Sequence, residues 1–453
     1  MGKLKKDMCT GPLLPNIILY TIPIVLTTIL QLLFNAADLV IVGRFCGSHS
    51  VAAVGATSSL IHLIVNFFMG ISIGSGVTVA HAIGGHDDKQ VSRTIHTAIP
   101  VALGCGIIIT VIGISCATPI LKLLNTPAEI LHLSATYINI YFAGSVFMVL
   151  YNFCAAILRA AGDTKSPLKF LTLAGFVNVV LNIVFVTAFH LNVAGVALAT
   201  SISNMLSALL ALRALMKRDD ACKFYFSKIK IDIRSLKKML MIGIPSGIQS
   251  SMFSISNVII QSSVNSFGAT FVSGASAAGN IEGFVYVLNN AFCQTAMNFA
   301  GQNTGAGNYK RVHRTMLICL ACVTVSGSIL GATVYYFGPS LLSIYITDSA
   351  EAIACGMIRF SYICLPYFLG GLMEVASGTL RGMGASLSTM FTTIFGVCGF
   401  RILWIYTVFS IPKFHTPDML YVSYPITWTL TFIILLVIFY IVYNKRKKQI
   451  KSC

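Results

Sequence analysis

Charged side chains are scarce in this 453-residue chain, which has only 14 acidic residues and 10% charged residues in all. A soluble globular protein averages about 25% charged residues, so an ordinary soluble domain is excluded. Hydrophobic residues make up 56% of the chain, and the mean hydropathy is +0.82. A helix needs about 20 apolar residues to cross roughly 30 Å of hydrocarbon. The composition therefore indicates a membrane protein with many spans.

Motifs for ATP hydrolysis and for catalysis are also missing. A phosphate-binding loop needs G-x-x-x-x-G-K-[ST], whereas the sole Gly-Lys pair is Gly2-Lys3, at the wrong place. The segment "GISIG" around Ser72 fits G-x-S-x-G, but it lies in an apolar stretch without the strand-turn-helix that a nucleophile requires. We interpret its glycines as helix-packing residues. The chain is predicted not to be an enzyme.

Metal-ligand spacing and a cleavable leader are absent as well. Cys319 and Cys322 form a C-x-x-C inside an apolar segment, with no second ligand pair nearby, so a zinc or redox site is not expected. The start "MGKLKKDM" leads into a long apolar segment without a small-residue cleavage site, and we expect this segment to be a retained span. No cofactor is predicted.

Long apolar segments recur along the whole chain, at spacings typical of membrane-spanning helices. Because their number is even, the two termini are expected on the same side of the membrane. The predicted fold is an all-α polytopic membrane protein with twelve transmembrane helices, at residues 15–42, 51–80, 95–117, 131–158, 167–188, 193–213, 236–262, 272–298, 315–337, 354–380, 387–409 and 420–442.

The 31 lysines and arginines are distributed unevenly. Most fall at the termini and in alternate connections, and cytoplasmic loops carry such an excess. We therefore expect a multi-pass plasma-membrane protein with both termini in the cytoplasm. The net charge of +17 is then a topology signal and a contact for lipid headgroups, and no nucleic-acid partner is predicted. The residues assigned to the cytoplasmic side include Lys3, Lys5, Lys6 and Arg381.

The two halves of the chain resemble each other. Ile22-Pro23 recurs as Ile244-Pro245, "GGHDDKQVSRT" (84–94) as "GAGNYKRVHRT" (305–315), and "ILRAAGDTKSP" (157–167) as "TLRGMGASLST" (379–389), at nearly constant spacing. This indicates an internal duplication, with two parallel-topology six-helix bundles around a central cleft. The predicted domains are 1–213, a basic cytoplasmic linker 214–235, and 236–453 with a polybasic tail.

Ionisable residues inside predicted spans are functional candidates by default. The acids are Asp38, Glu282 and Glu374, and the clearest base is Arg401. Glu282 and Arg401 reach similar depths in the second half, where they form either a structural ion pair or part of a substrate-binding polar layer. In the first half, no basic residue at equal depth accompanies Asp38.

Asn178 and Asn182 lie one helical turn apart on the same face, at a depth similar to that of Asp38. A charge at mid-membrane costs about 3 kcal/mol on the insertion scale, and protonating an ordinary aspartate at pH 7 costs about 4 kcal/mol. These costs are close, so Asp38 is expected to exchange between a proton, a metal cation and a cationic substrate. Two amide carbonyls nearby suit a hard cation such as Na⁺.

Several segments resemble the multidrug and toxic compound extrusion (MATE) transporters: "NAADLVIVGR" after the Ile22-Pro23 pair, "ILRAAGD", "FVNVVLN" and "GNIEGF…GQNTGAG". The resemblance implies export of cationic, amphipathic small molecules by antiport with H⁺ or Na⁺. It implies cation or proton binding by Asp38 and Asn178, with further polar groups from Tyr137 and Thr200. Glu282 matches an acid often found in the eighth helix of the family, and Pro23 matches a proline associated with bending.

Three departures from the family pattern concern its acids. Many members have an aspartate where this chain has Asn182, and an acid of the seventh helix is absent from residues 236–262. Glu374 does not clearly match the acid of the tenth helix. The repeat partner of Asp38 is Ile260, so ion coupling is predicted to reside in the first half.

The sequence thus predicts a monomeric secondary transporter in the lipid bilayer, exporting organic cations in exchange for Na⁺ or H⁺. One alternative is a flippase for lipid-linked oligosaccharides, which has the same two-bundle plan. Another, outside transport, is a membrane receptor or structural protein.

Overall fold

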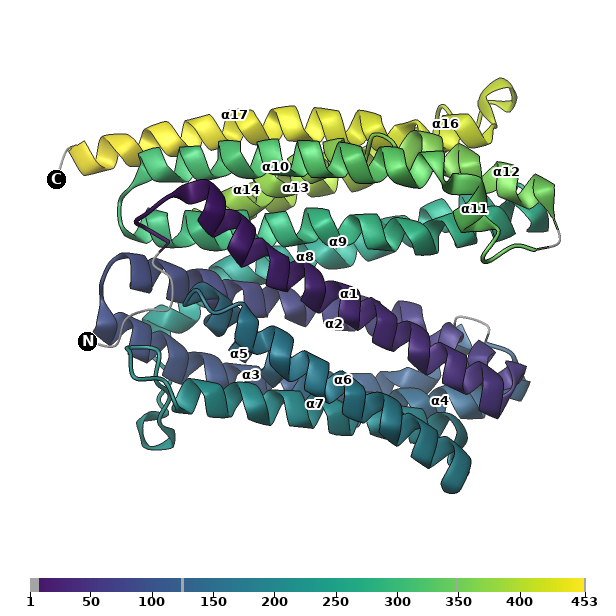
Figure 1. The fold of residues 1–453 in the computed structure, drawn as a ribbon, viewed down its shortest axis with the longest axis horizontal. Helices are drawn as coiled ribbons and strands as arrows, with labels where there is room; N and C mark the ends of the chain where they lie inside the picture. Colours follow the sequence, from purple (N-terminus) through teal and green to yellow (C-terminus); the bar gives the residue numbers. More distant parts are fainter. Residues whose placement is uncertain (1–7, 124–125, 348, 452–453) are drawn as a thin grey trace. The chain divides into compact units, whose positions relative to one another are not determined.

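The computed structural model describes residues 8–123, 126–347 and 349–451, which are almost entirely helical (Figure 1). Lys3, Lys5 and Lys6 lie outside the described residues. The first half contains α1 (Leu13–Cys46), α2 (Ser48–Gly84), α3 (Asp88–Leu123), α4 (Ala128–Ala143), α5 (Ser145–Ala160), α6 (Lys165–Ile183), the π-helix η1 (Val184–Ala188) and α7 (Asn192–Met216).

The second half begins after a short 3₁₀ turn, η2 (Phe226–Lys228). Its first helices are α8 (Ile233–Asn265), α9 (Ala269–Gly305), α10 (Tyr309–Tyr336) and α11 (Gly338–Leu342). They are followed by α12 (Ala350–Arg359), η3 (Phe360–Cys364), α13 (Tyr367–Gly382), α14 (Ser386–Thr393), η4 (Ile394–Gly399), α15 (Phe400–Tyr406), η5 (Pro412–Phe414), α16 (Pro417–Tyr421) and α17 (Ser423–Lys451).

In the described part of the chain, eight helical segments are long and apolar enough to cross a membrane. Two bent pairs raise this number to ten, α4 with α5 and α12 with α13. The long helices α8 and α9 are more polar and bring the count to the twelve predicted from the sequence. The predicted spans 131–158 and 354–380 are each bent, the first by 45° at Gly144 and the second by 40° near Pro366. Proline lacks the N–H that a continuous helix needs.

The turns repeat their backbone conformation between the halves, as a duplication requires. Gly47 and Gly268 both have positive φ, 84° and 89°, at the turns that precede α2 and α9. Gly162 and Gly384 do the same before α6 and α14, with φ of 83° and 81°. Glycine is favoured at these positions because it has no Cβ to clash in the left-handed region.

The chain divides into two compact units. Unit 1 is built on Ile22–Ser251, and unit 2 consists of Cys9–Thr21 and the chain from Met252 onward. In unit 1, α6 lies beside α7 and α3 beside α5; in unit 2, α9 and α17 lie against α13 (Figure 1). The first helix of each repeat is shared: α1 passes from unit 2 to unit 1 two residues before Pro23, and α8 passes from unit 1 to unit 2 six residues after Pro245.

Glycines of "GISIG" allow close helix packing within unit 1. A Cβ on Gly70 would lie 2.1 Å from the backbone nitrogen of Gly247, and one on Gly74 would lie 2.1 Å from the carbonyl oxygen of Met239. Ser72 donates a hydrogen bond to the carbonyl of Met69 in its own helix, at 2.7 Å. The interpretation of this segment as a packing motif is confirmed, since the backbones of α2 and α8 meet there.

The connection between α7 and α8 is held against the start of α3. The backbone N–H of Tyr225 donates to His96 Nε2 at 3.1 Å, and the backbone N–H of Asp232 donates to Thr97 Oγ1 at 3.0 Å. Phe224 is buried and stacks on the His96 ring. The basic linker is therefore an ordered part of unit 1.

Candidate functional site

A chain of hydrogen bonds connects three helices of unit 1. Asn182 of α6 donates through Nδ2 to the Asp38 carboxylate of α1 at 2.5 Å, and the same Nδ2 lies 3.3 Å from Asn178 Oδ1. Asn178 donates in turn to Thr200 Oγ1 of α7 at 3.4 Å. The structure thus brings together four of the residues singled out from the sequence. We call Asp38, Asn178, Asn182 and Thr200 the amide chain.

Close contact between α1 and α6 brings these side chains together. A Cβ on Gly175 would lie 1.8 Å from the Phe34 ring, so α1 approaches α6 closely at a position where α6 has no side chain. Asp38 follows Phe34 by four residues, and Asn182 follows Gly175 by seven, so both pairs share a helical face. The π-helix η1 begins two residues after Asn182, and π-helical turns often occur at functional sites.

Tyr137, the fifth predicted residue of this site, lies beside the amide chain. Its ring packs against an apolar cluster of Ile41, Val42, Val186 and Val196, which comes from the turns next to Asp38 and Thr200. It also stacks with Tyr141 at 6.3 Å between ring centroids. Tyr137 is therefore part of the apolar packing beside the amide chain.

The amide chain presents acceptor oxygens to a ligand. Asp38 forms no ion pair with any residue in the described ranges. Asn182 is 0% exposed, and its Oδ1 has no hydrogen-bond partner among the described atoms. A buried acceptor without a partner is costly. One carboxylate and one free amide carbonyl together form a set of oxygens that a proton or a small cation would satisfy.

In unit 2, Glu282 of α9 pairs with Arg359 of α12, not with Arg401. Arg359 Nη2 and Nε donate to Glu282 Oε2 at 2.7 and 3.0 Å, and Tyr367 donates to Glu282 Oε1 at 3.5 Å. Of the two alternatives for Glu282 and Arg401, the direct ion pair is therefore not formed. Helices α9 and α12 approach closely at Gly274, where a Cβ would lie 2.1 Å from the Ala352 carbonyl oxygen, and this brings the Arg359 side chain to Glu282.

Arg401 of α15 is instead held by neutral groups. Its Nε donates to Thr427 Oγ1 at 3.1 Å, and its guanidinium carbon lies 3.7 Å from the centre of the Tyr424 ring and 5.8 Å from that of Trp428. The π-helix η4 ends at Gly399 and is followed directly by α15. Arg401 is 4% exposed, and its Nη2 has no hydrogen-bond partner among the described atoms.

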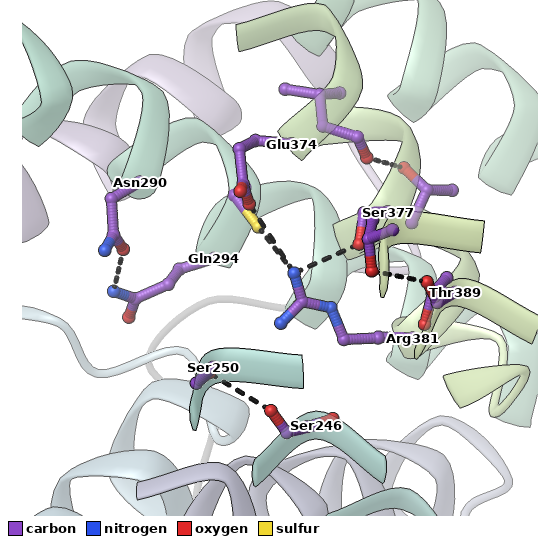
Figure 2. A network of polar contacts seen from close by, with 12 residues as sticks. Ser246, Ser250, Asn290, Gln294, Glu374, Ser377, Arg381 and Thr389 are labelled. Atoms are coloured by element: carbon purple, nitrogen blue, oxygen red, sulfur yellow. Dashed lines mark hydrogen bonds and ion pairs between the residues drawn. The ribbon is translucent and has the colours of Figure 1, made fainter. Parts of the chain in front are cut away.

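Glu374 of α13 is paired with Arg381, seven residues further along the same helix. The distance from Arg381 Nη2 to Glu374 Oε2 is 3.5 Å, and the same nitrogen donates to Ser377 Oγ at 3.1 Å and to Cys293 Sγ at 3.7 Å (Figure 2). Arg381 was expected in the connection after the predicted span 354–380, but it lies in the last turn of α13 and its side chain is buried inside unit 2. In Figure 2 the amides of Asn290 and Gln294 also contact each other, at 2.6 Å.

Arg359 and Arg381 were not predicted from the sequence as members of the polar layer. Arg359 lies five residues into the predicted span 354–380, so its position inside an apolar segment was a usable signal. Arg381 is two helical turns from Glu374, on the same face. That spacing pointed to an ion pair within one helix.

Known proteins resemble this chain in sequence and in fold. The family model MatE matches residues 23–184 and again 245–407, one match in each half. The chain is 28% identical over 393 residues to the probable multidrug resistance protein YpnP of Bacillus subtilis, covering 85% of this chain and 86% of that protein. It is 24% identical over 403 residues to the probable multidrug resistance protein NorM of Thermotoga maritima, with 85% and 84% covered.

Solved structures show the same fold. A MATE protein in complex with MaL6 superposes with a TM-score of 0.91 at 20% identity, covering 99% of this chain and 100% of that one. A MOP superfamily transporter from Pyrococcus furiosus, described as having a binding pocket of reverse polarity, gives a TM-score of 0.91 at 19% identity, with 99% of each chain covered.

Proposed function

Because the chain belongs to the MatE family of multidrug efflux transporters, we propose that it exports organic cations by antiport with Na⁺ or H⁺. The proposed setting is the plasma membrane, with both termini in the cytoplasm and the protein acting as a monomer. No cofactor takes part apart from the coupling ion. The substrates are small, cationic, amphipathic molecules.

The amide chain is the observation that carries this proposal. Asp38 has an amide partner and no cationic partner in the described part of the chain. An aspartate held this way keeps its charge available for an exchangeable ion, because no arginine or lysine neutralises it permanently. The unpartnered Asn182 Oδ1 adds a neutral oxygen. Asn178 and Thr200 orient Asn182, and Tyr137 shields the site from lipid.

The proposed mechanism follows from competition for Asp38. A ligand shifts a conformational equilibrium only through different affinities for the two states. Binding of Na⁺ or H⁺ at Asp38 from outside removes the negative charge that attracts a cationic substrate, so the substrate leaves. We assign to Pro23 the bend of α1 that accompanies this change, since an internal proline removes one helical hydrogen bond. Glu282 and Glu374 act as structural partners of Arg359 and Arg381.

Transport by reconstituted vesicles tests the proposal. A fluorescent organic cation is followed in proteoliposomes under an imposed pH gradient and, separately, under an imposed Na⁺ gradient. Asp38→Asn is expected to abolish gradient-driven accumulation while the protein remains folded. The matched control is Asp219→Asn, which removes one carboxylate from a side chain that is 88% exposed, and it should transport normally. Accumulation that ignores both gradients would overturn antiport, and full activity of Asp38→Asn would overturn the role of Asp38.

Export of a lipid-linked oligosaccharide remains a second candidate because unit 2 contains more buried cations than the sequence analysis placed there. Arg359, Arg381 and Arg401 are all largely buried, and arginine binds the phosphates of such lipids well. Two of the three are already paired with glutamates. The same vesicles, loaded with a fluorescent lipid diphosphate sugar, separate the two functions: protein-dependent flipping without cation export would favour the flippase.

A further inference from the structure

The charge of Arg401 is not balanced by a partner within the described protein. Buried charges are normally paired, since removing an ion from water costs several kcal/mol even after relaxation. Glu282 is the carboxylate whose charge acts on Arg401, but both of its hydrogen bonds from guanidinium nitrogens come from Arg359. Arg359 thus forms the ion pair with Glu282, and Arg401 has none. Together, the cluster of Glu282, Arg359 and Arg401 has a net charge of +1.

The groups around Arg401 satisfy it only in part. Thr427 accepts from Nε, and Tyr424 and Trp428 offer the faces of their rings. Such cation–π contacts are favourable when desolvated, but they do not offset the cost of burying a lone charge. Nη2 remains buried without an acceptor. The environment therefore has a donor and a positive charge to offer, and it lacks an anion.

We propose that Arg401 binds a small monovalent anion of the halide class, of which chloride is the commonest in water. The anion accepts a hydrogen bond from Arg401 Nη2 and brings the charge of the cluster to zero. The rings of Tyr424 and Trp428, which face Arg401, pack together with Tyr367 in one aromatic group beside it. The centroids of Tyr367 and Tyr424 lie 5.4 and 5.7 Å from that of Trp428. This site lies in unit 2, and it goes beyond the ion exchange proposed for unit 1.

Trp428 provides a direct reporter. The chain has two tryptophans, so Trp404→Phe leaves Trp428 as the sole emitter beside Arg401. The full-length purified protein is titrated with sodium bromide against sodium gluconate at constant Na⁺ concentration, so that any Na⁺ effect at Asp38 is held fixed. We expect saturable quenching by bromide, and saturable protection against this quenching by chloride. Arg401→Gln should leave only the weak linear quenching of collisions.

Two variants make the result specific. Lys413→Gln removes one positive charge from an exposed side chain of the same unit, and it should keep the saturable response. Glu282→Gln removes the competing negative charge, so half-saturation is expected at a lower bromide concentration. Linear quenching that is identical before and after the Arg401→Gln substitution would overturn the site.

Thermal unfolding of the unaltered protein gives a second readout if Arg401→Gln fails to fold. A ligand that binds only the folded state raises the Tm as its concentration exceeds Kd. The Tm should rise in chloride relative to gluconate at equal Na⁺, and above Kd the rise should continue with the logarithm of the chloride concentration. A Tm that is equal in the two salts over the whole range would count against the anion as firmly as the absence of saturable quenching.

Discussion

The polar layers of the two units differ although their backbones derive from one duplicated plan. Unit 1 places one carboxylate among neutral amides and a hydroxyl, whereas unit 2 binds Glu282 and Glu374 to arginines. A carboxylate with an arginine partner is already neutralised by that partner, and an exchangeable cation would have to displace the guanidinium. A carboxylate with an amide partner has no such competitor. The duplication therefore preserved the framework and left the exchangeable acid in one copy.

The largest effect is expected from breaking the ion pair of unit 2. Arg359→Gln leaves Glu282 largely buried without its cation, and removing one partner of such a pair costs about 3–5 kcal/mol. The apparent Tm of the purified protein should fall steeply. The corresponding change in unit 1, Asp38→Asn, should alter stability by less than about 1 kcal/mol, because Asn182 still finds an acceptor.

A double variant separates charge from packing. Glu282→Gln combined with Arg359→Gln should recover most of the lost Tm, since two neutral amides leave no lone charge. If the double variant has a Tm as low as that of Arg359→Gln, the two side chains stabilise the fold through their packing and not through their charges. The electrostatic difference between unit 1 and unit 2 would then be smaller than expected.

An intermediate effect is expected from removing the amide that organises unit 1. Asn182→Leu leaves the Asp38 carboxylate without its donor, at a cost of about 1–3 kcal/mol, and should also abolish gradient-driven transport. Asn290→Leu is the comparison variant in unit 2, where Asn290 accepts a hydrogen bond from the neutral amide of Gln294 at 2.6 Å, and it should cost less because no carboxylate loses its donor. Differential scanning fluorimetry compares the Tm of the two variants. An equal fall in Tm for both would contradict the special role of Asn182.

The smallest effects are expected where the two copies agree. Gly47→Ala and Gly268→Ala force a Cβ into positive φ, at a cost of about 1–2 kcal/mol each, and nothing lies within 4 Å of either Cβ position. The two changes should lower the Tm by similar amounts. Gly55→Ala and Gly283→Ala are helical controls with equally open surroundings, and they should be neutral or slightly stabilising. An unequal fall in Tm for Gly47→Ala and Gly268→Ala would show that the two repeats differ in backbone as well as in their polar side chains.

Local patterns predicted a large part of this molecule. The apolar periodicity gave the twelve helical segments, and the repeated motifs gave the two halves, because both signals are carried by neighbouring residues. Asn178 and Asn182 share a face by their spacing alone, and placing Asp38 at their depth required only counting from the ends of the helices. The bends at Gly144 and Pro366 were missed, since an apolar segment reads the same whether or not it is broken.

The sequence by itself determined the membrane class and the duplication, and it predicted the depths of Asp38, Glu282 and Arg401. Only the tertiary structure decided which residue each one meets. Glu282 and Arg401 were predicted at similar depths, yet the close approach of α9 and α12 brings Glu282 to Arg359, and Arg401 contacts aromatic rings instead. Depth is a property of one helix, whereas pairing depends on the relative rotation of two helices, which residues far apart in the chain set through their packing.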